Sequence, residues 1–244
     1  MKKMILYILA LPFCLSSQAQ QHFFGIIQDA DGYVNVRDSA KTIIDKLADN
    51  QVFFDWDAAG WKDSTEWHSI EYAAKPGITK SGGEKGLTRR GRIHRSRIHY
   101  LHQLPKLAEQ PNSSDTCLVF ANDTLTVEIR LRRFHPRRHK IVRYAEGDFI
   151  RSIDGCTALL GIDGDMPRTE YVSISVRHPG GVSEFPAQYL AHLYEPATQG
   201  VTVALGKGNT LFISTCNGDG AGGYYAVWTV ENYLVKSLFV LHDF

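Results

Sequence analysis

Between residues 125 and 131, apolar and polar side chains alternate without a break. Leu125, Val127, Ile129 and Leu131 are apolar, and the residues between them are polar. Successive side chains of a β-strand point to opposite faces of its sheet, so this pattern predicts a strand with one buried and one solvated face. Residues 172–177 repeat the alternation. Each segment is therefore expected in a sheet with one face buried in a core and the other face in solvent. This pattern favours an all-β fold.

Short apolar runs bounded by turn residues predict further strands on both sides of these segments. They are expected at 24–28, 33–36, 43–47, 52–56, 67–72 and 91–94, and then at 141–144, 149–153, 201–205, 211–215, 224–230 and 234–240. One short helix is expected after Pro186, because Tyr189, Leu190 and Leu193 share a helical face. Residues 75–90 contain several glycines and few apolar side chains, which predicts a mobile loop.

The N-terminus has the features of a signal peptide over residues 1–19. Lys2 and Lys3 precede an apolar run from 4 to about 15, and the small residues Ser17 and Ala19 suit a signal peptidase. The run is shorter than the roughly 20 residues that span a bilayer, so no transmembrane segment is expected after its removal. Cys14 leaves a lipoprotein as one alternative, and an uncleaved membrane anchor is the other. The mature chain is expected in the periplasm of a Gram-negative-type bacterium or in the medium.

Composition and charge narrow the function classes. Hydrophobic residues make up 43% of the chain and charged residues 22%, which is enough apolar material for a core and excludes a disordered chain. The first part is rich in Asp, whereas residues 89–97 and 130–143 are rich in Arg. An exported protein rarely meets nucleic acid, so we expect no nucleic-acid partner. The basic segments are expected to be a solvated face or a contact for an anionic surface, such as lipopolysaccharide or wall polymer.

Two motifs resemble the bacterial SH3-like domain family. Residues 31–37 (DGYVNVR) resemble its opening motif, and residues 91–98 (GRIHRSRI) resemble its last strand with the short helical turn. The resemblance covers residues 23–101 and implies a small SH3-like barrel. The family's Gly-Pro turn is missing at 39–41, and the insertion at 75–90 is long, so the family's ligand contacts are not carried over.

The second half of the chain is expected to be a separate domain. Residues 102–114 contain Pro105 and Pro111 and are expected to form a linker. Residues 115–244 are then a second, mostly antiparallel β domain. Its segments at 153–155, 161–167, 189–196 and 217–225 resemble an uncharacterised secreted bacterial domain, and this resemblance implies no activity.

The aromatic residues of the first domain are the best candidates for ligand binding. Small barrels have little room for large rings, and exposed rings provide rigid contact area for peptides or sugars. Trp61 follows the turn residue Gly60 and is expected to be exposed, whereas the other rings could instead form the core. The candidate ligand-binding residues are Tyr33, Trp56, Trp61, Trp67 and Tyr72.

Catalytic and metal sites are not indicated. The glycine-rich loops at 163–165 and 217–220 carry acidic residues, which suit hairpin turns as well as calcium. His135 and His139 have helical metal-ligand spacing, but Pro136 lies between them and cations surround them. No activated serine motif is present, and Cys117, Cys156 and Cys216 lie in strand or turn contexts. We therefore expect no cofactor and no metal, and we favour a protein that is not an enzyme.

The leading hypothesis is an exported recognition or scaffold protein that binds a peptide, a cell-wall fragment or a partner protein. One alternative is an envelope-acting enzyme with a site in the loops 163–165 and 217–225. The other is a protein inhibitor or assembly factor that acts by pairing of exposed strand edges.

Overall fold

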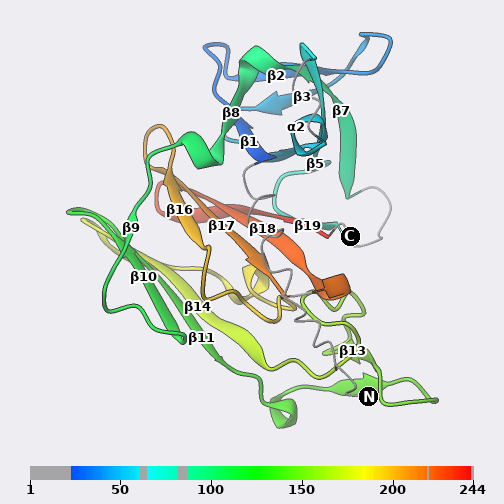
Figure 1. Cartoon of the computed structure of the whole chain (residues 1–244). Helices are drawn as coiled ribbons and strands as arrows, with labels where there is room; N and C mark the ends of the chain where they lie inside the picture. Colours follow the sequence, from blue (N-terminus) through cyan, green and yellow to red (C-terminus); the bar gives the residue numbers. More distant parts are fainter. Residues whose placement is uncertain (1–22, 61–64, 82–86, 219, 243–244) are drawn as a thin grey trace, which may run out of the picture.

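The computed structural model describes residues 23–60, 65–81, 87–218 and 220–242. The predicted signal peptide and Trp61 lie outside these residues. The prediction of an all-β fold is confirmed: three sheets lie in layers, and a two-stranded hairpin projects at one end (Figure 1). Among the described residues, no helix is long and apolar enough to cross a membrane.

The first layer is a curled antiparallel sheet of seven strands, which forms a half-barrel. Its strand order is β3-β2-β7-β5-β4-β1-β8. A small apolar core that includes Val36, Leu47 and Ile93 fills its concave side. The strands are β1 (Phe24–Ile27), β2 (Tyr33–Arg37), β3 (Ile43–Ala48), β4 (Phe53–Asp55), β5 (Trp67–Ala73), β7 (Thr88–His94) and β8 (Ile98–Tyr100).

The second and third layers form a β-sandwich. The middle sheet has the order β16-β17-β18-β19-β6, and the outer sheet has the order β15-β14-β11-β10-β9. The middle strands are β16 (Thr202–Leu205), β17 (Thr210–Asn217), β18 (Tyr224–Glu231), β19 (Leu234–Leu241) and β6 (Ile78–Ser81). The outer strands are β9 (Ala108–Glu109), β10 (Cys117–Ala121), β11 (Thr126–Arg133), β14 (Thr169–His178) and β15 (Gly181–Glu184).

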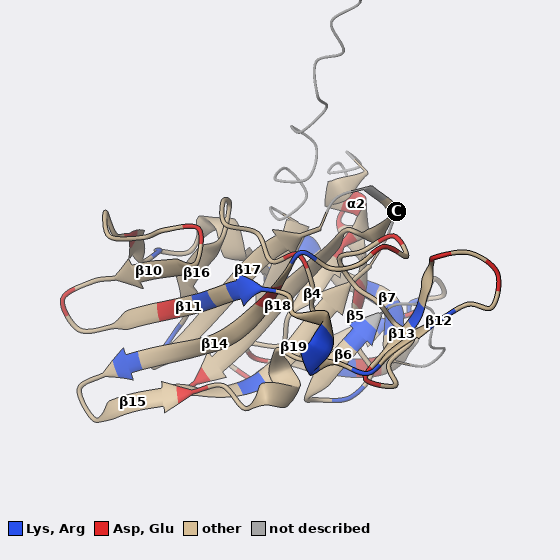
Figure 2. Cartoon of the chain, turned by 90° about the horizontal axis from the view of Figure 1, so that it is seen from below, with Lys and Arg blue, Asp and Glu red and all other residues tan. Residues whose placement is uncertain are grey.

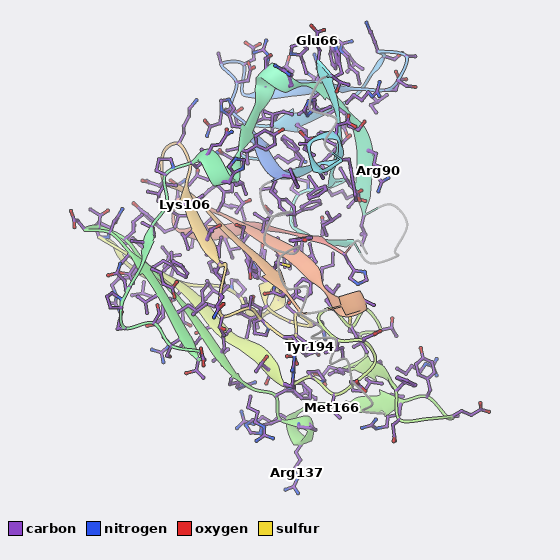
Figure 3. All side chains as sticks on the ribbon, in the orientation of Figure 1. Glu66, Arg90, Lys106, Arg137, Met166 and Tyr194 are labelled. Carbon is purple, nitrogen blue, oxygen red and sulfur yellow. The ribbon has the colours of Figure 1, made fainter. Side chains whose placement is uncertain are left out.

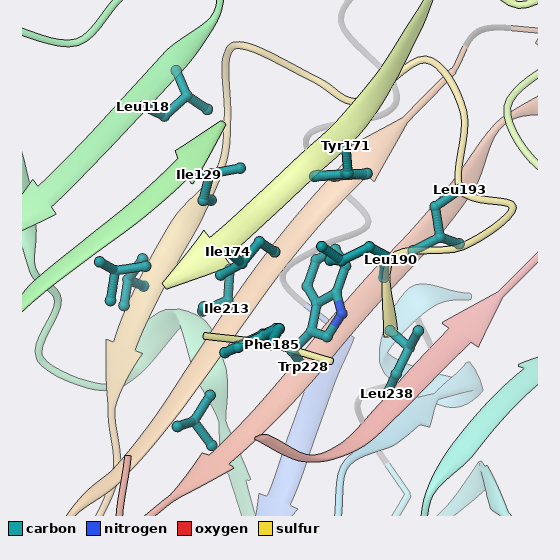
Figure 4. Packing of buried hydrophobic residues seen from close by; sticks show 14 of the residues in the cluster. Leu118, Ile129, Tyr171, Ile174, Phe185, Leu190, Leu193, Ile213, Trp228 and Leu238 are labelled. Carbon is teal, nitrogen blue, oxygen red and sulfur yellow. The ribbon is translucent and has the colours of Figure 1, made fainter. Parts of the chain in front are cut away.

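The largest apolar core lies between these two sheets, with Trp228 near its centre (Figure 4). The indole of Trp228 is fully buried, and its Nε1 donates a hydrogen bond to the Tyr189 carbonyl at 3.0 Å. Ile129 of β11 and Ile174 of β14 reach the same core from the outer sheet. The strict alternation seen in the sequence of these two strands therefore has its expected cause.

Strand β18 is buried on both faces. Trp228 and Val230 face the sandwich core, whereas Tyr225 and Val227 belong to a second core together with Phe24 of β1. A strand that is covered on both sides has no need of polar alternation, which explains its almost continuous apolar sequence. The two halves of the chain thus share one apolar core.

Three local predictions need correction. Residues 75–90 were expected to be a loop, but 78–81 form β6, which pairs in parallel with β19, and 88–90 belong to β7. The helix expected after Pro186 is a single 3₁₀ turn, Ala187–Tyr189. The described α-helix is instead α2 (Trp56–Ala59), where a strand end was expected; the Asp55 carboxylate caps it by accepting from the amides of Asp57 and Ala58.

The segment expected to be a linker, 102–114, contributes to both sheets of the sandwich. The Leu107 amide donates to the Val203 carbonyl at 2.9 Å, and the Leu107 side chain lies in the sandwich core. Directly after it, β9 pairs with β10. Separate folding of the two halves stays a prediction, and these contacts and the shared core weigh against it.

Candidate functional site

A groove in the N-terminal sheet brings together two of the predicted binding residues, Tyr33 and Trp67. Its volume is about 420 Å³, and the remaining lining residues are mostly polar: Asp29, Asp31, Val34, Asn35, Arg37, His94, Ser96 and Arg97. Tyr33, Asn35 and Arg37 alternate along β2, so their side chains leave the strand on the same face. This strand face supplies one side of the groove.

Strand pairing explains how Trp67 reaches the same groove. Trp67 of β5 lies opposite His94 of β7, and their rings meet edge to face with centroids 5.5 Å apart. Strand β7 in turn pairs with β2 at a single position, Arg37 opposite Arg92. The Arg37 guanidinium lies 5.9 Å from the centre of the Trp67 ring. A cation over an indole face is attracted to the π-electrons of the ring, which favours this arrangement.

The groove carries both signs of charge. Arg97 and Asp29 both line the groove and form an ion pair at 2.5 Å, so these two charges neutralise each other. Asp31 is exposed, and no ion pair to its carboxylate is found among the described residues. The Arg37 Nη1 donates to the Lys41 carbonyl at 2.7 Å, and Arg37 also lacks a carboxylate partner in the described chain. A ligand with a positive and a negative group could therefore meet Asp31 and Arg37 at the same time.

The Tyr33 ring is 38% exposed, and the Lys46 ammonium lies 3.9 Å from its centre. Trp67 is half-buried. Both rings thus offer apolar surface to a ligand while their other sides are packed. Such partly fixed aromatic rings lose little conformational entropy on binding.

Trp56 lies away from this groove. Its Nε1 donates to Glu71 at 3.1 Å, and the Arg90 guanidinium lies 4.8 Å from its ring centre. Glu71 is buried and also accepts from Arg90 Nε at 2.8 Å. Trp56 therefore belongs to a polar network that joins α2 to β5 and β7.

Tyr72 is a core residue with 1% exposure. Its hydroxyl donates to Asp45 at 3.1 Å, and Arg89 donates to the same carboxylate oxygen at 2.7 Å. Burial, reinforced by the Asp45 charge, raises the pKa of Tyr72 above its ordinary value. Trp61 lies outside the described residues, so its predicted role in binding stays a prediction.

The two glycine-rich loops lie against each other. The Gly161 amide donates to the Gly222 carbonyl at 2.8 Å. Asp163 and Asp165 line a polar hollow with Arg168 and Glu195. Asn217 is fully buried, and its Oδ1 accepts from Thr215, from Tyr171 and from the Ala197 amide, which is a structural role. Asp219 lies outside the described residues.

Sequence reasoning missed a second cluster, around His139. Its Nδ1 donates to Asp154 at 2.7 Å, and its Nε2 lies 3.2 Å from Glu170. Glu170 is buried and is also paired with Arg132. The hydrogen bond from His139 is the main reason why the pKa of Asp154 lies below its usual value. His139 was considered only as a partner of His135, because the sequence gives no sign that Asp154 and Glu170 lie beside it.

A neighbouring hollow of about 290 Å³ is lined by this cluster together with His192. Burial lowers the pKa of His192, and the nearby Lys80 ammonium lowers it further. Among the described residues, no group of three or more His, Cys, Asp or Glu side chains is placed to hold a metal ion. No disulfide joins the described cysteines Cys117, Cys156 and Cys216.

Comparisons with family models, with curated proteins and with solved structures gave no match for this chain. The resemblance of residues 23–101 to SH3-like domains therefore stays a prediction. The polar residues Asp29, Asn35, His94 and Ser96 were not predicted as binding residues, although the alternation of Tyr33, Asn35 and Arg37 could have indicated one exposed strand face.

Proposed function

We propose that this chain is an exported recognition protein whose groove in the N-terminal sheet binds a peptide-containing ligand, such as a cell-wall fragment. The observation that carries the proposal is the meeting of Tyr33 and Trp67 in one groove that also contains Asp31 and Arg37. Aromatic surface suits the apolar parts of a peptide. The two charged side chains suit an ammonium and a carboxylate. Wall peptides carry all of these groups.

The experiment uses soluble peptide-bearing fragments released by enzymatic digestion of purified wall material. Their binding is measured by calorimetry and by the tryptophan fluorescence of the protein. Tyr33→Ala, Arg37→Gln and Asp31→Asn each remove one feature of the groove. Tyr144→Ala is the matched control, because Tyr144 is exposed and lies outside the groove.

The proposal predicts weaker binding for the three groove variants and unchanged binding for the control. If no fragment binds, or if the groove variants bind as well as the unaltered protein, the groove is not the recognition site. Export is tested separately. Intact mass of protein recovered from the cell envelope should show a chain that begins at Gln20.

A second candidate function, an inhibitor or assembly factor, is favoured by strand β3. This strand lies at the edge of the first sheet, and Ile43 and Ile44 are 50% and 46% exposed. An exposed edge with apolar side chains can pair with a strand of another protein. Ile44→Lys should abolish such pairing and leave fragment binding in the groove unchanged.

A further inference from the structure

The β12–β13 hairpin presents an unusual exposed surface. It consists of β12 (Ile141–Arg143) and β13 (Ile150–Ile153), and it lies with the short turn Pro136–Arg138 at the end of the molecule opposite the half-barrel (Figure 1). Ile150 and Ile153 are buried in a small core beneath it. Val142, Tyr144 and Phe149 are instead 38%, 56% and 58% exposed.

These apolar side chains are held in place by the hairpin. The Tyr144 amide donates to the Phe149 carbonyl at 3.1 Å, so both rings flank the start of the loop. The Phe149 ring rests on Gly164, where an added Cβ would lie 2.8 Å from it. A bulkier residue at 164 would displace the ring. The exposed aromatic surface is therefore built into the fold.

Cations surround the hairpin. Six exposed Arg and Lys side chains lie on it or on the segment that leads to it from the end of β11: Arg133, Arg137, Arg138, Lys140, Arg143 and Arg151. None of the six forms an ion pair with another described residue, although ion pairs are common elsewhere in the chain. Figure 2 shows Lys and Arg on β12 and β13 and acidic residues in the loop between them.

Four exposed carboxylates lie close to these cations: Glu146 and Asp148 in the loop, and Asp163 and Asp165 on either side of Gly164. They do not balance the six cations. Figure 3 shows Arg137 extending from this end of the molecule into solvent, far from Glu66 at the other end. Unpaired Arg side chains that are free to extend can reach phosphate groups of a partner surface.

From this combination we infer that the hairpin docks on an anionic lipid surface. Arg and Lys are attracted to anionic headgroups, while Tyr and Phe side chains enter the boundary between headgroups and acyl chains. Arg143 directly precedes Tyr144, and Arg151 lies two residues after Phe149, so a cation adjoins each ring along the chain. The hairpin would contact the surface through these side chains. The site is separate from the groove of the proposed function.

The test is flotation with vesicles of phosphatidylcholine alone and of phosphatidylcholine with 30% phosphatidylglycerol. The protein is the chain from Gln20 onward, which contains every residue that the structure describes and lacks the apolar N-terminal run. We expect binding to the anionic vesicles only. Binding should fall steeply between 0.05 and 0.5 M NaCl, because salt screens the attraction.

Two variants separate the charged and apolar contributions. Arg137→Gln/Arg138→Gln should lower partitioning roughly tenfold or more, and Phe149→Ser should lower it about threefold to tenfold. Arg177→Gln and Leu234→Ser are matched controls, because both residues are exposed and lie outside the hairpin. Thermal unfolding of each variant tests whether it is folded. We expect little change, because exposed substitutions rarely change stability by more than about 0.5 kcal/mol.

The inference is overturned if the protein binds neutral and anionic vesicles equally, or if it binds neither. It is also overturned if Phe149→Ser leaves vesicle binding unchanged, since the surface would then attract polyanions in general. Because fragment binding in the groove is measured without lipid, failure of one proposal does not affect the other.

Discussion

His68 Nδ1 lies 2.7 Å from Oδ2 of Asp55, and neither side chain is more than 1% exposed. Tyr100 donates to the same carboxylate oxygen at 2.8 Å, while the other oxygen caps helix α2. One buried carboxylate thus connects β4, β5, β8 and α2. A buried charge is tolerated when its hydrogen bonds are satisfied, and losing one partner leaves the others unsatisfied.

We expect Asp55→Ala to lower the free energy of unfolding by about 3–5 kcal/mol, because it leaves His68 and Tyr100 without this acceptor and removes the helix cap. Asp55→Asn keeps an acceptor of the same shape and should cost about 1–2 kcal/mol. Urea unfolding followed by circular dichroism measures both. Equal losses for the two variants would show that the network contributes little beyond packing.

Tyr33→Ala is expected to weaken fragment binding by about 1–3 kcal/mol, which is roughly tenfold to a hundredfold. Its effect on stability should stay within about 0.5 kcal/mol because the ring is exposed. Trp67→Ala should weaken binding too, but it also removes a half-buried ring from β5. Calorimetric titration combined with thermal unfolding distinguishes a lost contact from a lost fold. Unchanged affinity in both variants would contradict a role for these rings.

Phe239→Ala is expected to cost about 3–5 kcal/mol, because Phe239 is buried in the core that the two halves share. The loss of stability should be detected in the strands on both sides of that core. Native-state hydrogen exchange should show reduced protection in β1 as well as in β18. Reduced protection in β18 alone would instead support two separately folding domains. Phe149→Ala serves as the exposed control.

Acid stability should depend on Asp154. Its pKa in the folded protein lies below the ordinary value of 3.8, chiefly because His139 donates a hydrogen bond to it. Its contribution is therefore complete only above about pH 5 and is lost as the pH falls through 3.8 and then through the lower folded pKa. Asp154→Asn should reduce stability at neutral pH slightly and flatten its decline below pH 4. An identical acid decline in the variant, measured by urea midpoints, would contradict this.

The strands that the sequence predicted best are those with a simple environment. Ile129 and Ile174 alternate with polar neighbours because only one face of their sheets is covered, and β18 is apolar throughout because both faces are covered. Strand β6 could not be predicted in this way. It is short, follows Pro76 and Gly77, and is held by pairing with β19, a segment distant in the sequence.

The groove was predicted only in part, because it too depends on pairing between strands that are distant in the sequence. Tyr33 and Trp67 each carry a local signal as an aromatic residue beside a turn or in a strand, but their meeting depends on the order β2-β7-β5. Tyr72 carries the same local signal as Trp67 and is nevertheless buried. Trp67 and Tyr72 are an odd number of residues apart on β5, so they point to opposite faces of the strand.

The parallel pairing of β6 with β19 has a consequence for the order in which the molecule is assembled. Residue 78 lies opposite residue 238, which comes 160 residues later in the sequence. During synthesis, β6 therefore has no strand to pair with until about 160 further residues have been made. Contacts between such distant segments slow folding, because a long loop must close before they form. We expect β6 to pair late in folding, and removal of β19 to leave β6 as an unpaired, adhesive segment in the first half.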